Sequence, residues 1–337
     1  MVVGIDTIEY FLPEGVLSNT DLIGFFPGWS EEKIFNKLGI KERRIARPDE
    51  LVSDMAIGAA KRLFDNANCD PESIDYLILC TQSPDFYLPA TACIIQEKLG
   101  LGKNIGAFDF NQGCSGYIYG LSICKGLIQT GIARKILFIT AETYSKHINK
   151  NDKSTRTIFG DAATASIIME EPSLAKIRSF DFGTDGSGYR NLIVPAGGMA
   201  LPKSEDTRIE REDEDGNVRS SENLYMNGSA IYDFCMETVP ITVEKLLNKE
   251  KLSIEEIDFF VFHQANKFMV DSLRKKMKID KDKVTISLEN VGNTVSCTIP
   301  IAIKEMQKEG KLKKGQIIML VGFGVGYSWG STIIETT

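Results

Sequence analysis

The sequence is poor in histidine, in tryptophan and in positive charge. Its 337 residues contain two tryptophans and two histidines, His147 and His263. The 39 lysines and arginines are outnumbered by 46 aspartates and glutamates, which gives a formal net charge of -7. A nucleic-acid-binding domain usually carries a basic footprint, so this balance argues against nucleic acid as a partner. A mechanism that needs an imidazole has two residues to choose from.

Long apolar runs and paired cysteine motifs are also missing. No run approaches the roughly 18 apolar residues of a membrane-spanning helix, so we expect no membrane insertion. The N-terminal stretch MVVGIDTIEYFLPEG has no cationic segment followed by an apolar one, and it predicts no secretory signal. The seven cysteines form no CxxC pair or cysteine–histidine cluster, which argues against a metal site and a disulfide framework. These features predict a cytoplasmic protein with reduced thiols.

The chain repeats a pattern of strands and helices. Residues 72–82, ESIDYLILCTQ, resemble residues 254–264, IEEIDFFVFHQ, and each stretch has the short apolar run of a buried strand. Both are followed by a helix-like stretch, a strand, a turn of small residues, a second helix and another apolar strand. We therefore predict an α/β protein of two related halves, 1–175 and 176–337, with mostly parallel sheets covered by helices. The alternative is that two α/β stretches resemble each other by chance.

This topology predicts where the functional site lies. Sheets of this kind present functional groups at the C-terminal ends of their strands, so we expect the active site where the two halves meet. The polar segment 200–224, ALPKSEDTRIEREDEDGNVRSSENL, interrupts the pattern and has no apolar period. We interpret it as a surface insertion, and the alternative is a loop near the mouth of the site.

Cys114 is the strongest candidate for a nucleophile. It lies in the stretch NQGCSG, which follows an apolar strand ending in FDF and opens a helix that runs to about Gly131. Small residues on a strand-to-helix turn would expose the sulfur, and a helix N-terminus would favour the thiolate and lower the thiol pKa. A cysteine in a tight turn is otherwise a packing residue, and we keep that interpretation for the other six.

His263 is the candidate imidazole. It begins HQAN at the end of the apolar strand IDFFVF, where an α/β enzyme presents functional groups. A lone histidine is more often a core residue bonded to backbone, but its position beside the expected interface of the halves favours a functional role. His147 lies in the polar stretch TYSKHINKND, and we expect it to face solvent.

Two glycine-containing turns complete the candidate site. Asn293, in VGNT, occupies the place in the second half that Cys114 occupies in the first, so the repeat should bring the two side chains close together. An asparagine in such a turn is otherwise structural. The stretch GFGVG at 322–326 follows the apolar run IIMLV, and its glycines permit close approach of backbone N–H groups to an oxyanion. A phosphate-binding role is weaker, because the pattern is not GxGxxG before a helix.

Taken together, these segments resemble β-ketoacyl-acyl carrier protein synthase III, a family of the thiolase superfamily, over nearly the whole chain. Each segment alone is weakly specific, and the combination is highly specific. The residues that carry the resemblance are LGIKERRIA at 38–46, GCSGYIYGL at 113–121, FGDAATA at 159–165, HQAN at 263–266, GNT at 292–294 and GFGVGYSWGS at 322–331.

The resemblance implies a five-layer αβαβα fold, a homodimer and a triad of Cys114, His263 and Asn293. An acyl group would pass from an acyl-CoA to Cys114, and malonyl carried on acyl carrier protein would then lose carbon dioxide. Neutral His263 and the Asn293 amide would donate hydrogen bonds to the thioester oxygen, and the carbanion would attack the acyl-cysteine. The backbone N–H groups of Cys114 and Val325 would hold the tetrahedral oxyanion. No metal or redox cofactor is implied.

The resemblance also implies residues of the substrate pocket. Leu88, before Pro89, matches a position that lines the acyl pocket across the dimer, and Phe323 and Gly324 belong to the same predicted pocket. Lys33 and Lys37 stand where well-known members hold the coenzyme A adenine with a tryptophan and an arginine. This difference leaves open a specialised CoA ester or a carrier-bound acyl donor.

A basic run on one expected helix is the candidate contact for the acyl carrier protein. Phe268 stands where an arginine commonly meets the carrier in the family, two residues after HQAN. The neighbouring cations could meet an acidic carrier protein or a phosphopantetheine phosphate, and the alternative is a solvated helix face. These cations are Lys267, Arg274, Lys275 and Lys276.

Neighbouring families fit less well, although other functions stay open. A thiolase would carry a second cysteine in the C-terminal glycine-rich loop, and hydroxymethylglutaryl-CoA synthase would place a glutamate base near Gln82. Chain-elongating synthases use two histidines where this chain offers His263 and Asn293. An acyltransferase or non-decarboxylating condensing enzyme of a specialised pathway remains an alternative, as does a catalytically silent partner subunit. A metabolite-binding Rossmann protein is the weakest option, because no dinucleotide fingerprint follows a strand.

Overall fold

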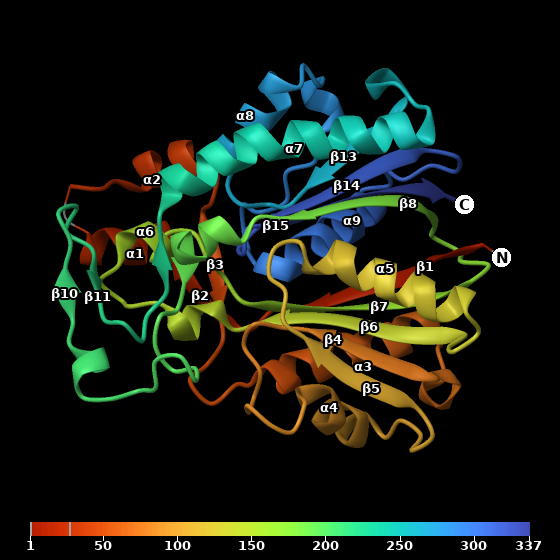
Figure 1. The fold of residues 1–337 in the computed structure, drawn as a ribbon, viewed down its shortest axis with the longest axis horizontal. Helices are drawn as coiled ribbons and strands as arrows, with labels where there is room; N and C mark the ends of the chain where they lie inside the picture. The colour runs from red at the N-terminus through yellow and green to blue at the C-terminus, as the bar shows by residue number, and fades with distance from the viewer. Residues whose placement is uncertain (1, 27) are drawn as a thin grey trace.

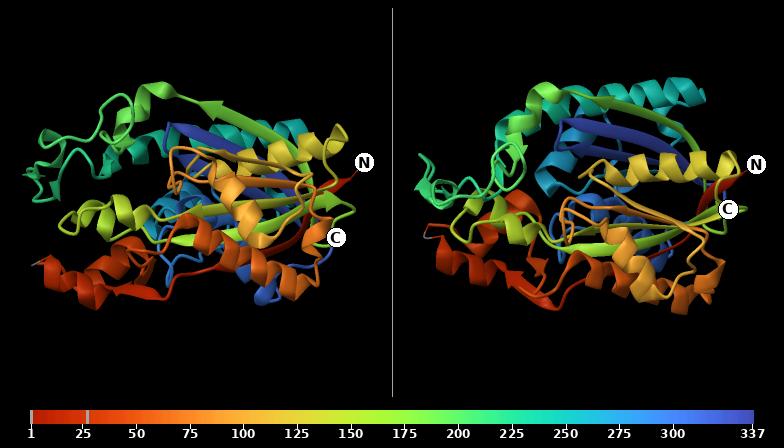
Figure 2. Two further views of the ribbon diagram at one scale, coloured as in Figure 1. Left: turned by 90° about the horizontal axis from the view of Figure 1, so that it is seen from below. Right: turned by 60° about the horizontal axis from the view of Figure 1, so that its bottom comes forward.

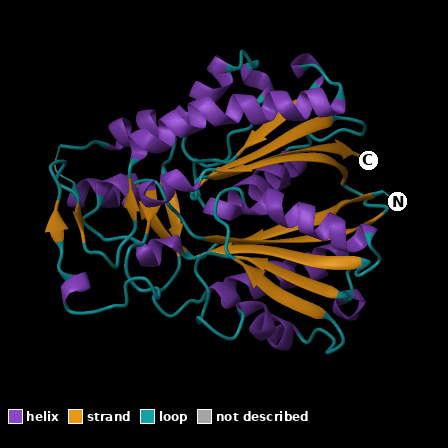
Figure 3. Ribbon diagram, in the orientation of Figure 1, coloured by secondary structure: helices purple, strands orange, loops and turns teal. Residues whose placement is uncertain are grey.

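A computed structural model describes residues 2–26 and 28–337. Within these residues, nine strands form one mixed sheet in the order β13-β14-β15-β8-β1-β7-β6-β4-β5. Figures 1 and 3 show the sheet as two parts, one above the other, with helices between them and on both outer faces. The strands are β1 (Val3–Phe11), β4 (Tyr76–Cys80), β5 (Gly106–Phe110), β6 (Lys135–Glu142), β7 (Ala162–Glu170), β8 (Ala175–Thr184), β13 (Phe259–Phe262), β14 (Ile317–Gly324) and β15 (Ser328–Thr336).

The centre of the sheet is antiparallel, so the prediction of mostly parallel sheets is wrong there. Strand β4 lies parallel to β5 and β6, and β13 lies parallel to β14. The five pairs between them, from β6–β7 to β14–β15, are antiparallel. The connections explain the difference. Residues 325–327 join β14 to β15, which is enough for a hairpin and far too short for the crossover that a parallel pair requires.

The two parts of the sheet share an order of strands. Reading inward, the first part runs β4-β6-β7-β1 and the second runs β13-β14-β15-β8. Beside β4 lies β5, and beside β13 the corresponding element is a single parallel bridge between Phe260 and Val284. The parts join where β1 pairs with β8, at Gly4–Lys176 and Ile5–Ala175. This order supports the division into halves 1–175 and 176–337, which we retain as a proposal.

Three pairs of helices make the other layers (Figure 1). Helices α5 (Gly116–Gln129) and α9 (Thr298–Lys308) lie in the middle and contact strands of both parts. Helices α3 (Val52–Ala67) and α4 (Thr91–Leu99) cover the outer face of the first part. Helices α7 (Gly228–Glu250) and α8 (Lys267–Lys276) cover the second. The arrangement is the five-layer αβαβα architecture that the family resemblance implies.

Apolar side chains of α5 and α9 fill the space between the two parts of the sheet. Because both faces of this middle layer are covered, its side chains are withdrawn from water on all sides, and each large aliphatic one stabilises the fold by about 1.5–3 kcal/mol. The helix α5 begins two residues after Cys114, so this packing also fixes the position of the turn. The buried residues include Tyr117, Ile118, Leu121, Ile128, Ile299, Ile303 and Met306.

Shorter elements gather at one end of the sheet, on the left in Figure 1 and again in both views of Figure 2. Among them, β9 and β12 pair with each other and so close the chain between them into a loop. The segment 200–224 lies in that loop and includes the pair β10–β11. These elements are β2 (Gly15–Ser18), α1 (Asn19–Phe25), α2 (Glu31–Leu38), β3 (Glu42–Ile45), α6 (Lys153–Arg156), β9 (Leu192–Ile193), β10 (Arg211–Glu212), β11 (Val218–Arg219) and β12 (Tyr225–Met226).

The helices of the described residues fall short of what a lipid bilayer requires. None of them is both long enough and apolar enough to span a membrane. The longest, α7 (Gly228–Glu250), carries charged residues along its length and contains Pro240. Its buried side chains instead face the second part of the sheet.

Candidate functional site

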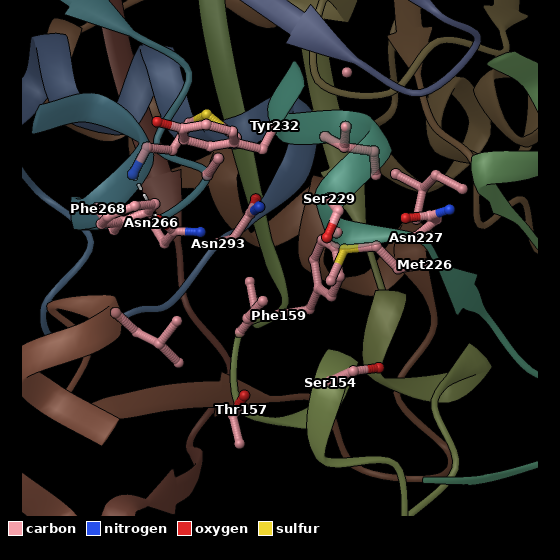
Figure 4. Close-up of a pocket in the computed structure, with 18 of the residues that line it drawn as sticks. Ser154, Thr157, Phe159, Met226, Asn227, Ser229, Tyr232, Asn266, Phe268 and Asn293 are labelled. Atoms are coloured by element: carbon pink, nitrogen blue, oxygen red, sulfur yellow. Dashed lines mark hydrogen bonds between the residues drawn. The ribbon is translucent and has the colours of Figure 1, made fainter. Parts of the chain in front are cut away.

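A cavity of about 960 Å³ opens at the end of the sheet where the short elements gather. Cys114 from the first half and His263 and Asn293 from the second half all line it. Phe323 and Gly324, which the sequence analysis assigned to the pocket, line it as well. Figure 4 shows Asn293 and Phe159 on one wall, with Tyr232 and Phe268 on another and Met226 and Ser229 across from them.

Cys114 lies in the turn between β5 and α5, with only 5% of its surface exposed. Burial raises the pKa of its thiol to about 12, although the backbone N–H of Val325 donates to the sulfur and lowers it. The anionic form of Glu142 raises it further. The expectation of an exposed sulfur with a low pKa is therefore wrong. The thiol therefore carries its proton at neutral pH.

Three glycines allow the backbone to come close to this cysteine. A Cβ on Gly324 would lie 2.8 Å from the Cys114 sulfur, so a larger residue there would displace the thiol. A Cβ on Gly113 would meet the side chains of Val325 and Gln82 at 2.4 and 2.6 Å. One on Gly116 would meet the sulfur of Cys80 at 2.4 Å. The turn therefore requires glycine on both sides of the cysteine.

His263 follows β13 and is almost fully buried. Its Nδ1 lies 2.8 Å from the hydroxyl of Thr298, the first residue of α9, so Nε2 is the nitrogen left for the cavity. The ring meets Phe323 edge to face at 5.6 Å. Burial lowers the pKa of His263 to about 3, and a hydrogen bond with the backbone of Val295 raises it only in part. The imidazole is therefore neutral at physiological pH.

Asn293 lies in a turn that the first half helps to hold. Its backbone N–H donates to the carbonyl of Ile158 at 2.9 Å, and its carbonyl accepts from Gly160 at 3.0 Å. Its side-chain Oδ1 accepts the N–H of Val295 at 2.9 Å. Because Oδ1 is occupied in this way, Nδ2 is the end of the amide that can donate into the cavity (Figure 4).

The other histidine lies elsewhere than expected. His147 is half-buried, not solvent-facing, and its ring meets Tyr144 edge to face at 6.1 Å. Burial lowers its pKa. It does not belong to the cavity lining, which contains His263 alone among the histidines of the described residues.

Trp29 is a cavity residue that the sequence analysis missed. It lies just before α2 and lines the cavity together with Lys37. The ammonium groups of Lys33 and Lys37 lie 5.2 and 5.9 Å from the centre of its ring. The predicted lysines thus flank an aromatic surface that lies one helical turn upstream of Lys33. The signal was available, because tryptophan occurs only twice in the sequence.

The polar segment 200–224 forms part of the cavity mouth, so its interpretation as a plain surface insertion is wrong. Asp213, Asp215 and Arg219 line the cavity. Arg219 pairs with the fully buried Asp152 at 3.0 Å and also with Asp213. Asp152 caps α6, which contributes Lys153 and other residues to the same wall. This ion-pair network fastens the segment to the body of the protein.

The remaining predicted contact residues lie outside the cavity lining. Leu88 is 82% exposed on a loop with Phe86 and Tyr87 and does not reach the cavity of its own chain. On α8, Lys267 pairs with Asp271 and Arg274 donates to the carbonyl of Ile279 at 3.1 Å. Lys275 is exposed.

Of the α8 residues singled out from the sequence, Phe268 is the one that lines the cavity. It is 57% exposed and stacks on Tyr232 with ring centres 5.5 Å apart (Figure 4). The pair places an apolar surface beside the basic face of α8, on the route between the outside and the buried triad.

Glu142 is a second residue that the sequence analysis did not single out. It ends β6 and is fully buried. Burial raises the pKa of its carboxyl group to about 8, and hydrogen bonds from Gln82, Ser296 and Ser83 lower it only in part. No ion pair in the described ranges involves it. A glutamate at the end of an apolar strand usually faces water, so the sequence alone did not indicate that Glu142 is buried.

The chain is similar to known proteins in its family models, in its sequence and in its fold. Residues 108–186 match the family model 3-oxoacyl-[acyl-carrier-protein (ACP)] synthase III, and residues 247–336 match the model of its C-terminal part. The chain is 40% identical over 325 residues to β-ketoacyl-[acyl-carrier-protein] synthase III of Caldanaerobacter subterraneus subsp. tengcongensis, covering 96% of this chain and 95% of that protein. It is 38% identical over 308 residues to the synthase of the same name from Clostridioides difficile, covering 91% and 90%.

The solved structures agree with the sequence matches. A crystal structure of a 3-oxoacyl-(acyl-carrier-protein) synthase III superposes with a TM-score of 0.97 at 48% identity, covering 99% of this chain and 100% of that one. Both models of the family fall on the segments that carry Cys114, His263 and Asn293. The chain belongs to the 3-oxoacyl-acyl carrier protein synthase III family, whose members are condensing enzymes of the thiolase superfamily.

Proposed function

We propose that Cys114, His263 and Asn293 carry out the reaction of this family in this chain. The reaction is the decarboxylative condensation of an acyl-CoA with malonyl-acyl carrier protein, which gives a 3-oxoacyl-acyl carrier protein. The observation that carries the proposal is that a thiol, an imidazole and a free amide N–H, drawn from two halves of the chain, line one cavity. These are the groups that acyl transfer and enolate formation require.

In the first half-reaction, the thiol of Cys114 takes the acyl group. The sulfur loses its proton and bonds to the thioester carbonyl carbon, the carbon–sulfur bond to coenzyme A breaks, and coenzyme A leaves as its thiol. The backbone N–H of Val325 donates to the Cys114 sulfur in the free protein, which supports our proposal that it holds the oxyanion. The N–H of Cys114 would be the second donor. Burial of the sulfur keeps water away from the acyl-enzyme.

In the second half-reaction, the malonyl thioester loses carbon dioxide. The electrons of the broken carbon–carbon bond move onto the thioester oxygen, which accepts hydrogen bonds from Asn293 Nδ2 and His263 Nε2. The carbanion carbon then attacks the acyl group, and Cys114 leaves as a thiolate that takes a proton from water. Donation by Nε2 of a neutral ring requires Nδ1 to accept a hydrogen bond. The Thr298 hydroxyl, 2.8 Å from Nδ1, supplies it when its proton turns to the ring from the Val295 carbonyl, which lies 3.0 Å away.

The cations and aromatic rings near the mouth are the proposed contacts for the two carriers. We propose that Trp29 and Lys37, which line the cavity, and Lys33, which lies over the Trp29 ring, contact the nucleotide end of coenzyme A. For the acidic carrier protein we propose the basic face of α8 around the mouth. Its residues are Lys267, Arg274 and Lys275.

We further propose a homodimer that is cytoplasmic. Strand β5 is at the edge of the sheet, and an unpaired edge can continue a sheet into a second copy. The neighbouring loop exposes Phe86, Tyr87 and Leu88, and large exposed apolar side chains grouped in this way favour a protein contact. Leu88 would then enter the acyl pocket of the other subunit. Seven free cysteines suit a reducing compartment.

Intact-protein mass spectrometry tests the proposal directly. The protein is incubated with a panel of short and medium acyl-CoAs and then with malonyl-acyl carrier protein, while carbon dioxide release is recorded. An acyl adduct on the Cys114 peptide that disappears with carbon dioxide release is the expected result. Cys114→Ala should form no adduct, whereas Cys93→Ala, which removes an exposed thiol in the first turn of α4, should behave like the wild type. Label taken up by Cys114→Ala would overturn the assignment, and an adduct that clears without carbon dioxide would indicate acyl transfer to another acceptor.

A further inference from the structure

The carboxyl group of Glu142 lies where the two halves meet beneath the cavity. Its Oε2 accepts hydrogen bonds from the backbone N–H of Gln82 at 3.0 Å and from the hydroxyl of Ser83 at 3.4 Å. Its Oε1 accepts the hydroxyl of Ser296 at 2.8 Å. One oxygen therefore holds the loop after β4 in the first half, and the other holds the short 3₁₀ turn η7 (Val295–Cys297) in the second.

On the first-half side, the bonded loop supports the turn of the nucleophile. The side chain of Gln82 packs against Gly113, where an added Cβ would lie 2.6 Å from its Oε1. Gln82 is itself fixed by the hydroxyl of Tyr144, which donates to Oε1 at 2.7 Å, and by its own Nε2, which donates to Asn111 at 3.0 Å. A shift of this loop would therefore reach Cys114 through Gly113.

On the second-half side, the same carboxyl group supports the groups that would stabilise the enolate. Ser296 lies three residues after Asn293 and two before Thr298, the partner of His263. Between them, Val295 donates to the Asn293 side chain and accepts the Thr298 hydroxyl at 3.0 Å. Fixing Ser296 thus fixes the segment from which both donors are oriented.

We propose that Glu142 is a positioning residue that couples the Cys114 turn to the Asn293–Thr298 segment by bridging Gln82 and Ser296. The inference rests on the proposed function, because it assumes that the two sides act on one substrate. A buried carboxyl group without a cationic partner destabilises the fold unless hydrogen bonds satisfy its oxygens. Glu142 has such bonds, and we assign them a positioning role. The distance between the nucleophile and the enolate donors is what this bridge sets.

The charge of Glu142 adds a signature that a passive structural residue would not give. Burial raises its pKa to about 8, so the group is protonated at neutral pH and ionises above that value. The anion raises the pKa of the Cys114 thiol and therefore opposes its ionisation at alkaline pH. Other titratable groups around it are Cys80 on β4, Tyr144, Cys297 on η7 and Asp161 before β7.

The test compares Glu142→Gln with Glu142→Met. Glutamine can accept from Gln82 and Ser83 and can donate to the Ser296 oxygen, so it keeps the bridge and removes the charge. Methionine is similar in length to glutamate, and it keeps neither the hydrogen-bonded bridge nor the charge. We expect Glu142→Met to lower kcat for condensation by about 10- to 100-fold, the effect of losing hydrogen bonds to a carboxyl group, with KM for acyl-CoA little changed. Glu142→Gln should stay within about threefold of the wild type at pH 7.

Two further measurements separate positioning from folding. Ser296→Ala keeps the carboxyl group and removes only its second-half partner, so it should slow carbon dioxide release more than formation of the Cys114 adduct. Iodoacetamide alkylation of Cys114, mapped by peptide mass spectrometry, should be faster in Glu142→Gln than in the wild type at pH 9 and equal at pH 7. Glu9→Met and Glu9→Gln are the matched controls, because Glu9 is a buried carboxyl group on β1 paired with Lys304 outside the cavity.

The outcomes are distinct from those that test the proposed function. If wild-type protein forms no Cys114 adduct, the proposed function fails, and Glu142 is not the cause. If it forms the adduct and releases carbon dioxide, the coupling role is overturned when Glu142→Met keeps wild-type kcat, or when both Glu142 variants lose activity equally. Unchanged half-reactions in Ser296→Ala would overturn it as well, even where Glu142→Met fails to fold.

Discussion

The two halves bring corresponding turns to one cavity and equip them with different chemistry. In the first half, β4 leads to Gln82 and the later turn carries Cys114; in the second, β13 leads to His263 and the later turn carries Asn293. Burial disfavours the charged form of both groups. It raises the pKa of the Cys114 thiol and lowers the pKa of the His263 imidazole. Each half therefore offers a neutral group. The comparison teaches that one repeated arrangement of strand and turn can place a thiol, an imidazole and an amide around the same cavity.

The largest effect should come from removing the amide donor of the second half. Asn293→Ala takes away Nδ2 and should lower the rate of carbon dioxide release from malonyl-acyl carrier protein by about 10²- to 10³-fold, as loss of an oxyanion donor does. The Cys114 adduct should still form, because the first half makes it. Single-turnover measurements of the two half-reactions check this. Equal loss in both would break the separation of roles between the halves.

A smaller effect is expected one step further from the substrate. Thr298→Val removes the hydroxyl that can donate to His263 Nδ1 and leaves the Val295 carbonyl, which can only accept. The ring is then kept in the Nδ1–H form, and carbon dioxide release should fall by roughly tenfold, the scale of one hydrogen bond. Thr298→Ser should restore it, and ¹⁵N chemical shifts of the imidazole report the tautomer. A valine variant with wild-type rates would contradict the role given to Thr298.

An effect of another kind concerns the stability of the fold in acid. The folded pKa of His263, about 3, lies below its ordinary value of 6.5, so below pH 6.5 the unfolded chain binds a proton that the folded ring does not. Stability from this residue is therefore lost as the pH falls from about 6.5 to 3, by at most about 1.4 kcal/mol per pH unit. Urea unfolding at pH 6.5 and 4.5 should show less acid loss in His263→Asn than in the wild type. His147→Asn is the comparison, because burial lowers the pKa of that ring as well, and identical slopes for all three proteins would refute the assignment.

The two related α/β halves and the candidate residues of the triad could be predicted because each rests on local patterns, whereas the five-layer arrangement was implied by the family resemblance. The strands before Gln82 and His263 are short apolar runs, and the glycines beside Cys114 and Asn293 mark the turns. The antiparallel centre of the sheet could not be read in the same way. Pairing direction depends on how short the connection between β14 and β15 is, and the apolar pattern of either strand is the same in both arrangements.

Residues judged from polarity or from one physical effect were the ones predicted wrongly. The segment 200–224 is polar because it borders a mouth, not because it lies away from the site. The pKa of Cys114 was expected to fall at a helix N-terminus, an effect of at most about 2 kcal/mol. Its rise from the ordinary 9.0 to about 12 corresponds to about 4 kcal/mol, so desolvation outweighs the helix. Burial of Glu142 depends on contacts from both halves, which no local pattern contains.

The pairing of β9 with β12 has a consequence for how such enzymes can change. Tyr225 faces Ile193 across this short ladder, so the two ends of the segment that lines part of the cavity mouth lie side by side. Its ends stay together whatever lies between them, while the nine-stranded sheet and the triad are built from other residues. The segment between β9 and β12 can therefore change in length and sequence while its two ends keep their positions. Substrate range can diverge through insertions and deletions there, and a designer could graft another loop at the same two strands if it also supplies a partner for the buried Asp152, which Arg219 pairs here.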